Sequence, residues 1–370
     1  MVGVTTVLAL FLLSPFGLQQ RAAETGLGEV LLAANFVIVV TRNFLVPSRA
    51  VMSNSPSPIR PRDVTHVRAI VFDPHAPRKF RFGEVAEPAP AAPNEMLIEV
   101  KAISLNFGEV FSTDNAENPG DVPGWDSLGV VLIPAADGSG PPAGARVVGA
   151  GWSRAWAQQR VLTSDNVAVV PDALDFQTAA ALPVAGVTAL QIVRRLGPVI
   201  GRRVLITGAS GGVGRLAVQL AARAGAHVIA AVGSAERGVG LRELGADEVV
   251  VGLRGVAPVY GVLEHVGGEM LADAFALLHD GGRVISVGAA SGQPTTIDYE
   301  AERMTMSKKR IEIFMMEWPI GADLQYVADL AASGQLDAQI GHRDSWDAFD
   351  VAIDALLGRK VAGKVALTVS

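Results

Sequence analysis

The sequence predicts an α/β protein that opens with an all-β region and continues as a doubly wound parallel sheet. Its 370 residues are 49% hydrophobic and 18% charged, which is the composition of a globular protein with large cores. From Val67 to about Asp175, short alternating segments are separated by Pro/Gly turns, as in antiparallel sheets. Beyond Asp175, apolar strands alternate with helical patterns, which indicates repeated βαβ units.

The first 61 residues differ from the rest. Met1 to Gln20 carries no charge, and a second apolar stretch covers Val30 to Val40. Both are short for a membrane span, which needs about 20 apolar residues, and Arg21 follows the first apolar run instead of preceding it as in a secretory signal. A membrane anchor or export signal is one interpretation. We favour a dispensable apolar extension and Pro/Ser-rich leader, with a cytoplasmic working protein that starts at Met52.

The all-β region and the parallel region each have their own expected elements. In the first, we expect strands at 67–72, 96–103, 145–150 and 156–161. In the second, we expect strands at 203–207, 227–232, 248–251, 261–266 and 283–287, with helices at 212–224 and 268–278. A final helix at 346–357 and strand at 363–369 have no βαβ partner, so we expect them to return to the first domain. The predicted division is residues 1–61, 62–182, 183–316 and 317–370.

A glycine-rich turn is the strongest local motif. The apolar segment 204–207 leads into Gly208-Ala209-Ser210-Gly211-Gly212-Val213-Gly214, and an amphipathic helical pattern follows. Read as G-x-G-x-x-G, the motif has Ala209 in place of the first glycine. Gly211 allows a pyrophosphate to approach the backbone, Gly214 allows close packing of helix on strand, and the helix amino terminus faces the anion. The sequence therefore predicts a dinucleotide-binding site.

Charge and cysteine content exclude several other classes of protein. The net charge is only -6, and Lys308-Lys309-Arg310 is the one basic cluster, so we expect no nucleic-acid partner. The absence of cysteine excludes disulfides, thiolate zinc sites, iron-sulfur clusters and a catalytic thiol. The six histidines show no H-x-x-x-H or comparable spacing.

From about Val67 to Val369 the chain resembles the medium-chain dehydrogenase/reductase superfamily, within it the zinc-independent quinone oxidoreductase group. The motifs that carry the resemblance are Pro183-Val184-Ala185-Gly186-Val187-Thr188-Ala189, Gly225-Ala226-His227-Val228, Leu244-Gly245-Ala246-Asp247, Gly281-Gly282-Arg283-Val284 and Gly363-Lys364-Val365. The resemblance implies a GroES-like, β-barrel-type substrate domain, a Rossmann domain and an active site in the cleft between them. It also implies a homodimer formed through the strand expected at 310–316.

Two further motifs predict that the chain binds no metal. Gly124-Trp125-Asp126 resembles the G-H-E stretch of zinc-dependent relatives with Trp125 in the histidine place, and Asn106-Phe107-Gly108-Glu109 resembles a quinone reductase motif with Asn106 in the cysteine place. An indole has no lone pair to donate to Zn²⁺. Without a Lewis acid, oxidation of a saturated alcohol becomes difficult, whereas reduction of a quinone or an α,β-unsaturated carbonyl by a dihydronicotinamide remains feasible.

Asn106 and Trp125 are the candidate catalytic residues. The Asn106 amide could stabilise a developing enolate, although an Asn that only holds a turn has the same pattern. Trp125, with Phe107 and Trp152, could provide an apolar face for a flat acceptor, or could belong to the core. Tyr260 and Tyr299 are possible acids, but their spacing does not select either. Two alternatives to the quinone or enone/enal reductase stay open: an enoyl-thioester reductase, and a nucleotide-binding sensor or structural protein with little turnover.

The expected cofactor is NADPH. An NAD-selective Rossmann fold places an acidic residue about 20 positions after the glycine turn, and here that position holds Val232-Gly233-Ser234. Ser234 and Arg237 can bind a 2′-phosphate, or can serve as a helix cap and a surface residue, and Glu236 argues the other way. The resemblance adds further expected contacts. The expected cofactor-binding residues are Thr188, Ala209, Ser210, Gly211, Gly212, Val213, Gly214, Ser234, Arg237, Val266, Gly267, Val287, Gly288 and Lys364.

Overall fold

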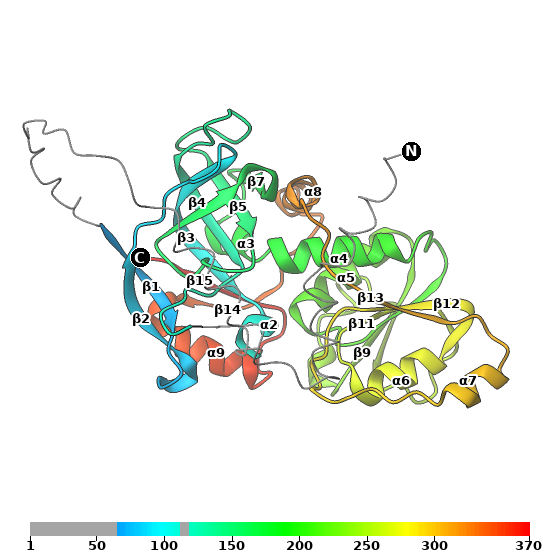
Figure 1. The fold of residues 1–370 in the computed structure, drawn as a ribbon. Helices are drawn as coiled ribbons and strands as arrows, with labels where there is room; N and C mark the ends of the chain where they lie inside the picture. Colours follow the sequence, from blue (N-terminus) through cyan, green and yellow to red (C-terminus); the bar gives the residue numbers. More distant parts are fainter. Residues whose placement is uncertain (1–64, 112–117) are drawn as a thin grey trace, which may run out of the picture. The chain divides into compact units, whose positions relative to one another are not determined.

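The computed structural model describes residues 65–111 and 118–370, which form a β-rich part and a parallel-sheet part (Figure 1). The predictions for residues 1–61, including a start at Met52, lie outside the described residues. Strands of the described residues make three sheets. No helix in residues 65–111 or 118–370 combines the length and apolar character needed to cross a membrane.

The β-rich part contains a two-stranded and a larger sheet. Its elements are β1 (His66–Phe72), β2 (Phe80–Ala86), β3 (Glu95–Leu105), α2 (Phe107–Phe111), β4 (Asp126–Ile133), β5 (Arg146–Ala150), β6 (Gln159–Thr163) and β7 (Val167–Val169), with 3-10 turns at Pro77–Lys79 and Ser164–Asn166. β1 pairs antiparallel with β2. The larger sheet runs β14-β15-β3-β4-β5-β7, where β14 (Ile340–Ser345) and β15 (Lys364–Thr368) come from the C-terminal segment, and β6 pairs with the first half of β3. β6 begins at Gln159, later than expected, because Trp156 bonds to Ile70 and Pro123 instead.

The second part is a parallel sheet with the order β10-β9-β8-β11-β12-β13. Its strands are β8 (Arg203–Ile206), β9 (His227–Val232), β10 (Glu248–Val251), β11 (Val259–Glu264), β12 (Leu278–Ser286) and β13 (Arg310–Ile313), and its helices are α4 (Pro183–Arg195), α5 (Gly212–Arg223), α6 (Gly268–Ala276) and α7 (Tyr299–Met304), with a 3-10 turn at Glu236–Gly238. The expected strand at 310–316 ends at Ile313, where pairing with β12 stops. The predicted doubly wound α/β fold is confirmed.

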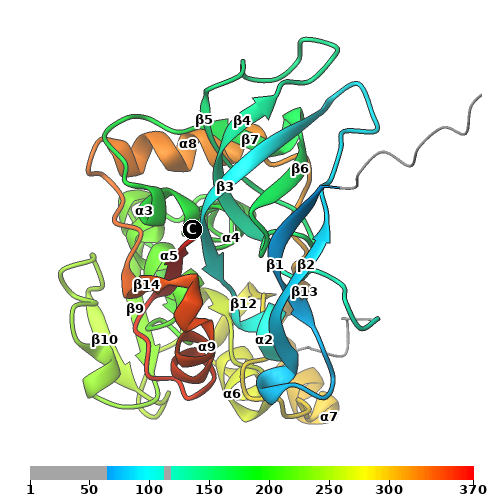
Figure 2. The ribbon, with the colours of Figure 1, turned by 90° about the vertical axis from the view of Figure 1, so that its left-hand side faces the viewer.

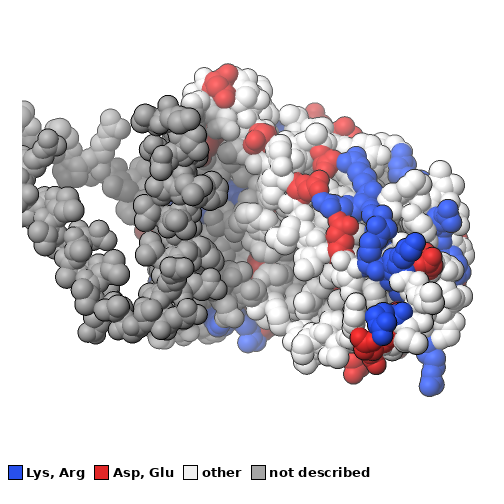
Figure 3. All heavy atoms as spheres, turned by 45° about the vertical axis from the view of Figure 1, so that its right-hand side comes forward, with Lys and Arg blue, Asp and Glu red and all other residues white. Residues whose placement is uncertain are grey.

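Alternate residues of the parallel strands pack on opposite faces of this sheet. On one face, Val204 and Ile206 join the core that includes helices α4 and α5. On the other face, Leu205 packs with Ile229 and with residues of α6. The period of two places one apolar residue on each face in turn, which explains why these strands are apolar throughout. Lys and Arg side chains gather over this part of the molecule with Asp and Glu beside them (Figure 3).

The C-terminal segment contributes its last strand to the sheet of the β-rich part. After β13 come α8 (Gly321–Ala332), β14 (Ile340–Ser345), a 3-10 turn at Trp346–Ala348, α9 (Phe349–Leu357) and β15 (Lys364–Thr368), while α3 (Phe176–Ala180) precedes α4. β15 pairs antiparallel with the second half of β3, beside which it runs in Figure 2. The first residue of β15 is Lys364, and Gly363 before it bonds through its N–H to the carbonyl of Ser210 at 3.0 Å. This strand therefore fastens the glycine-rich turn to the β-rich part.

Candidate functional site

The candidate site lies where β8 and β11 end, the point at which strand order reverses in the parallel sheet. In open α/β sheets, ligands bind outside the carboxyl ends of the strands at such a point. Gly208 follows β8 with a φ of +57°, a conformation that favours glycine. A Cβ on Gly214 would lie 2.4 Å from the Gly208 carbonyl oxygen and 2.8 Å from Cα of Ala209. The turn therefore has the close helix-to-strand packing that the motif predicts.

A buried carboxylate organises the loop that faces this turn. Oε1 of Glu264, at the end of β11, accepts hydrogen bonds from the Thr207 hydroxyl at 2.9 Å, the Val266 N–H at 2.8 Å and the Gly267 N–H at 3.0 Å. Burial raises the pKa of Glu264, and these hydrogen bonds oppose the shift. The Val287 N–H donates to the Glu264 carbonyl at 2.8 Å. The expected cofactor residues 266, 267, 287 and 288 are therefore brought together, although no sequence motif pointed to Glu264 itself.

His265 follows directly after Glu264 and turns its ring toward the end of β8. Its Nδ1 lies 2.9 Å from the Thr207 carbonyl oxygen, so Nδ1 carries the proton and Nε2 is an acceptor. Burial lowers the pKa of His265 to about 4, which keeps the imidazole neutral. Nε2 is buried and has no hydrogen-bond partner within the described part of the chain.

The expected 2′-phosphate corner lies beyond β9. A Cβ on Gly233 would have no atom within 4 Å, so space is open there. A hydrogen bond from Ser234 is the largest cause of the lowered pKa of the Glu236 carboxyl. Arg237 lies over the glycine turn, where Nε donates to the Ser210 hydroxyl at 3.1 Å and another guanidinium nitrogen donates to the Arg359 carbonyl. The C-terminal return thus holds Arg237 in place.

Two other expected cofactor residues lie apart from this corner. Thr188 is buried in α4, where its hydroxyl points at Sδ of Met316 at 4.0 Å. Lys364 is only 3% exposed, and a Cβ on Gly212 would lie 2.7 Å from Cδ of Lys364. The lysine side chain therefore crosses the glycine turn and carries its ammonium group into the β-rich part.

The ammonium of Lys364 ends in a buried polar cluster. Nζ donates to Oδ1 of Asn106 at 2.6 Å and to the Leu105 carbonyl at 3.2 Å, and it forms an ion pair with Oδ2 of Asp126 at 3.4 Å. Asp126 is fully buried and also accepts from Nδ2 of Asn106 at 2.8 Å and from the Val184 N–H at the start of α4 at 2.9 Å. A carboxylate at a helix amino terminus is stabilised by the helix dipole. Asp126 thereby joins three separate segments.

Glu109 is the second carboxyl of this cluster. Its side chain accepts hydrogen bonds from the Asn106 N–H at 2.7 Å and from the Trp125 N–H at 2.5 Å. The bond from Asn106 is one of the two hydrogen bonds of a capping box at the start of α2. Burial, followed by repulsion from Asp126, raises the pKa of Glu109 to about 8. The i, i+3 spacing of Asn106 and Glu109 is the sequence signal that could have identified this role.

The structure places the two candidate catalytic residues side by side but with different surroundings. Both polar ends of the Asn106 amide are used inside the cluster, Oδ1 by Lys364 and Nδ2 by Asp126. Trp125 is half-buried, and its ring contacts Trp152 edge-to-face at a centroid distance of 5.2 Å. The ring centroid of Trp152 in turn lies 5.6 Å from that of Trp318, which follows the carboxyl end of β13. The expected aromatic face therefore includes Trp318, which sequence reasoning missed.

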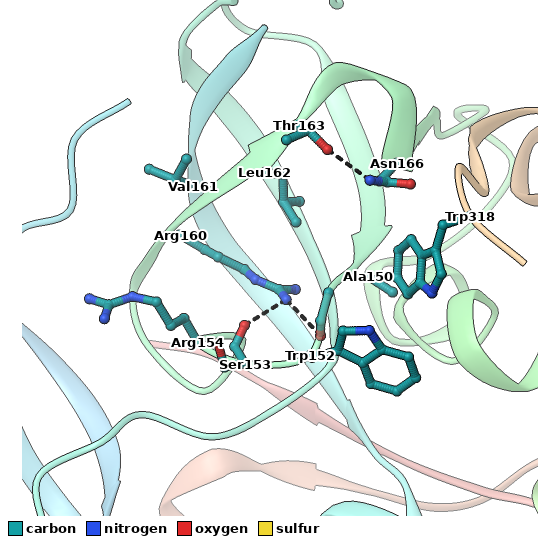
Figure 4. A pocket seen from close by; sticks show the side chains of 11 residues that line it. Ala150, Trp152, Ser153, Arg154, Arg160, Val161, Leu162, Thr163, Asn166 and Trp318 are labelled. Carbon is teal, nitrogen blue, oxygen red and sulfur yellow. Dashed lines mark hydrogen bonds between the residues drawn. The ribbon is translucent and has the colours of Figure 1, made fainter. Parts of the chain in front are cut away.

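Trp152 and Trp318 line a cavity of about 300 Å³ (Figure 4). Its other lining residues come from the end of β5 and the turn after it, from β6 and from the 3-10 turn that follows β6. They are Ala150, Gly151, Ser153, Arg154, Arg160, Val161, Leu162, Thr163 and Asn166. A cavity of this volume is at the lower end of small-molecule sites.

The donor set at Asn106 and Trp125 does not fit a zinc ion. The Asn106 amide is engaged by its neighbours, the Trp125 indole has no lone pair to offer, and the Lys364 ammonium already lies against Asp126. In the part of the chain that the structure describes, no group of three or more His, Asp or Glu side chains is placed to hold a metal.

Three comparisons with known proteins agree with this geometry. The family model described as "Zinc-binding dehydrogenase" matches residues 212–333. A quinone oxidoreductase of Salmonella typhimurium is 30% identical over 227 residues, which is 57% of this chain and 69% of that protein. The structure of the quinone oxidoreductase from Coxiella burnetii is 26% identical and covers 83% of this chain and all of its own, with a TM-score of 0.74. An Escherichia coli quinone oxidoreductase complexed with NADPH is 24% identical, with a TM-score of 0.71 over 81% of this chain and 99% of its own, and shows the same fold.

Proposed function

The chain belongs to the medium-chain dehydrogenase/reductase superfamily and is quinone oxidoreductase-like, and from this premise we propose that it transfers hydride from NADPH to a quinone or an α,β-unsaturated carbonyl acceptor without a metal. The observation that carries the proposal is Lys364, whose side chain crosses the glycine turn at Gly212 and ends on Asn106 and Asp126. One residue thus couples the dinucleotide site to the acceptor side.

NADPH as the cofactor is supported by the corner beyond β9. Open space at Gly233 admits a 2′-phosphate, and Arg237, in the 3-10 turn that follows, has its guanidinium held by Ser210 and Arg359. A guanidinium matches the geometry and the negative charge of a phosphate group. The complex of the Escherichia coli relative with NADPH supports the same choice.

The acceptor is proposed from the aromatic wall and the metal-free cluster. Trp152 and Trp318 contact each other in the cavity wall, and Trp125 packs edge-to-face on Trp152 behind them, which suits a flat conjugated molecule. The Lys364 ammonium pairs with Asp126 and Asn106, so these side chains are not free to hold a Lewis acid that would activate an alcohol. A quinone or enone needs orientation more than activation.

When bound, NADPH supplies the hydride, and the acceptor takes up one proton to complete the reduction. Nζ of Lys364 directs its donors at Leu105, Asn106 and Asp126, so we assign the proton to water. Glu264 holds the N–H groups of Val266 and Gly267 and thereby fixes the loop opposite the glycine turn. The chain's own contribution is to bind the acceptor and orient it.

A panel of acceptors tests the proposal. We expect purified protein to oxidise NADPH when some members of a set of quinones and 2-alkenals are added. The rate of NADPH oxidation should be low when no acceptor is present. Turnover only with a crotonyl thioester would replace the proposal by the enoyl-thioester reductase. Saturable NADPH binding without oxidation by any acceptor would favour the sensor or structural protein and refute the reductase.

Two finer predictions accompany the proposal. We propose that the protein forms a homodimer through the edge strand β13 and that it is located in the cytoplasm. Sedimentation velocity measures the first, and a mass equal to one chain at micromolar concentration would reject it. Cell fractionation with an antibody measures the second.

A further inference from the structure

The connection between α4 and β8 is an apolar turn between two pairs of arginines. Its sequence is Arg194-Arg195-Leu196-Gly197-Pro198-Val199-Ile200-Gly201-Arg202-Arg203. Leu196 and Val199 are buried and hold the turn on the core, whereas Ile200 is 81% exposed. Single exposed apolar side chains are common on protein surfaces. This one differs because arginines precede and follow it within the same turn.

A second connection lies beside this turn. The Gly201 N–H donates to the Gly225 carbonyl at 2.7 Å, and a Cβ on Gly225 would lie 3.2 Å from Cγ1 of Ile200. Ile200 therefore packs on the backbone of the turn that follows α5. Arg223 comes two residues before Gly225, in the last turn of α5. The two connections together form what we call the basic tip, whose exposed side chains are Pro198, Ile200, Arg202 and Arg223.

The basic tip carries positive charge that no acid neutralises. The acids at this end of the sheet are engaged by other residues: Asp323 by Arg194, Glu312 and Glu317 by Arg195, Glu248 by Arg203 and His227, and Asp247 by His227. Within residues 65–111 and 118–370, neither Arg202 nor Arg223 has a carboxylate at salt-bridge distance. The Arg202 guanidinium lies 5.1 Å from the ring centroid of Tyr260, a contact that leaves its charge in place. The tip is thus cationic, although the whole chain has a net charge of -6.

We propose that the basic tip docks the protein on an anionic lipid surface. Ile200 and Pro198 enter the boundary between headgroups and acyl chains, while Arg202 and Arg223 lie against the lipid phosphates. An aliphatic side chain between cations suits this boundary, because both parts of the surface find a matching environment. A nucleic acid would engage the two cations alone and leave Ile200 in water.

The position of the tip is compatible with the nucleotide site. The tip lies at the amino ends of β8 and β9, whereas the glycine turn follows the carboxyl end of β8. Docking therefore leaves the glycine turn at the end of the sheet that faces away from the lipid. The cytoplasmic leaflet of cell membranes is the one that carries anionic lipids. Reversible docking there agrees with the cytoplasmic location proposed above.

Binding of the full chain to lipid vesicles tests the proposal. We expect wild-type protein to sediment with vesicles of equal parts phosphatidylcholine and phosphatidylserine, and much less with phosphatidylcholine alone. Arg202→Glu/Arg223→Glu should weaken binding at least about twentyfold, since each basic residue near such a surface contributes about fivefold. Ile200→Ser should weaken it about tenfold through loss of apolar burial. Raising NaCl from about 0.05 to 0.5 M should release the protein, because salt screens exposed charges.

Two control variants make the same kinds of change on the C-terminal segment. Lys360→Glu reverses an exposed charge after α9, and Val351→Ser removes an exposed apolar side chain from α9. Both should bind vesicles as wild type does. Residues 1–64 are present in every variant, so any lipid binding of their own is common to all of them. Equal binding to the two kinds of vesicle, or equal losses in the tip and control variants, would overturn the proposal.

A single labelled position tests insertion directly. The chain contains no cysteine, so Ile200→Cys introduces one thiol for a nitrobenzoxadiazole dye, and Val351→Cys is its control. Anionic vesicles should shift the emission of the dye to the blue at position 200 and leave it unchanged at position 351. A shift at both positions or at neither would overturn the insertion of Ile200. These measurements use no NADPH or acceptor, so their outcome is independent of the proposed reductase function.

Discussion

The Nζ atom of Lys364 lies 2.6 Å from Oδ1 of Asn106, although 258 positions separate the two residues in the chain. The contact joins the first residue of β15 to the residue before α2, and the aliphatic part of the lysine packs on Gly212 of the nucleotide turn. It connects the last strand, the β-rich part and the glycine turn through one side chain. Removal of the Lys364 side chain should therefore affect the stability of the protein as well as its binding of the nucleotide.

We expect Lys364→Met to lower the free energy of unfolding by about 3–5 kcal/mol, because it leaves the Asp126 carboxylate buried without a cation. The double variant Asp126→Asn/Lys364→Met should recover much of the loss. Denaturant unfolding measures both. The control is Lys101→Met, whose ion pair with Glu99 is partly exposed, and which should cost less than about 1 kcal/mol. Equal losses in Lys364→Met and Lys101→Met would contradict the buried pair.

The raised pKa of Glu109 predicts a pH dependence of stability. Folding raises this pKa from 4.5 to about 8, so the folded protein binds the proton more tightly than the unfolded chain does. The resulting stabilisation is fully present below pH 4.5 and is lost as the pH rises to about 8. We expect the Glu109→Gln variant to show a flatter decline than wild type over that range. Unfolding curves at several pH values measure it, and parallel profiles for the two proteins would reject the assignment.

A methyl group on Gly214 should disrupt the nucleotide turn, whereas one on Gly233 should not. A Cβ added at Gly214 would lie 2.4 Å from the Gly208 oxygen, but one added at Gly233 would meet no atom within 4 Å. We expect Gly214→Ala to lose about 1–3 kcal/mol of stability and to bind NADPH at least about tenfold more weakly. Gly233→Ala should change the free energy of unfolding by less than about 0.5 kcal/mol, because its methyl group would meet no protein atom. Calorimetric titration and thermal unfolding separate the two variants.

The cofactor preference can be measured by kinetics. In wild type we expect kcat/KM for NADPH to exceed that for NADH. Arg237→Ala should lower the NADPH value about ten- to a hundredfold through loss of a charge-assisted hydrogen bond, and Gly233→Asp should act in the same direction by charge repulsion. A preference of the wild type for NADH, or an unchanged ratio in Arg237→Ala, would remove the proposed phosphate site.

Metal independence is the last prediction. Elemental analysis of purified protein should find no stoichiometric zinc, and EDTA should leave the rate of NADPH oxidation unchanged, because Asn106 and Trp125 offer no ligand set. A loss of rate on chelation of about tenfold, reversed by added Zn²⁺, would show that the site is metal-dependent.

Local patterns were sufficient for much of the parallel sheet, although β12 begins at Leu278, five residues before the expected strand. The strands at 227–232 and 248–251 and the start of the helix at Gly212 agree with the expected positions, because apolar runs with glycine turns determine such elements locally. The expected strands did not include β4, since residues 126–133 begin at Asp126, an acidic residue that strands disfavour. Its burial depends on Lys364 and α4, which lie far away in sequence.

The sequence by itself determined the α/β class, the glycine turn, the family resemblance and the lack of metal-binding side chains in the expected places. These follow from residue types and short spacings, which act within one element. Only the tertiary structure decided that Lys364 reaches Asn106, that Glu264 orders the loop opposite the glycine turn, and that Trp318 and Arg160 share a cavity. Such contacts join residues far apart in the chain, and their burial and electrostatics exist only once the sheets have packed.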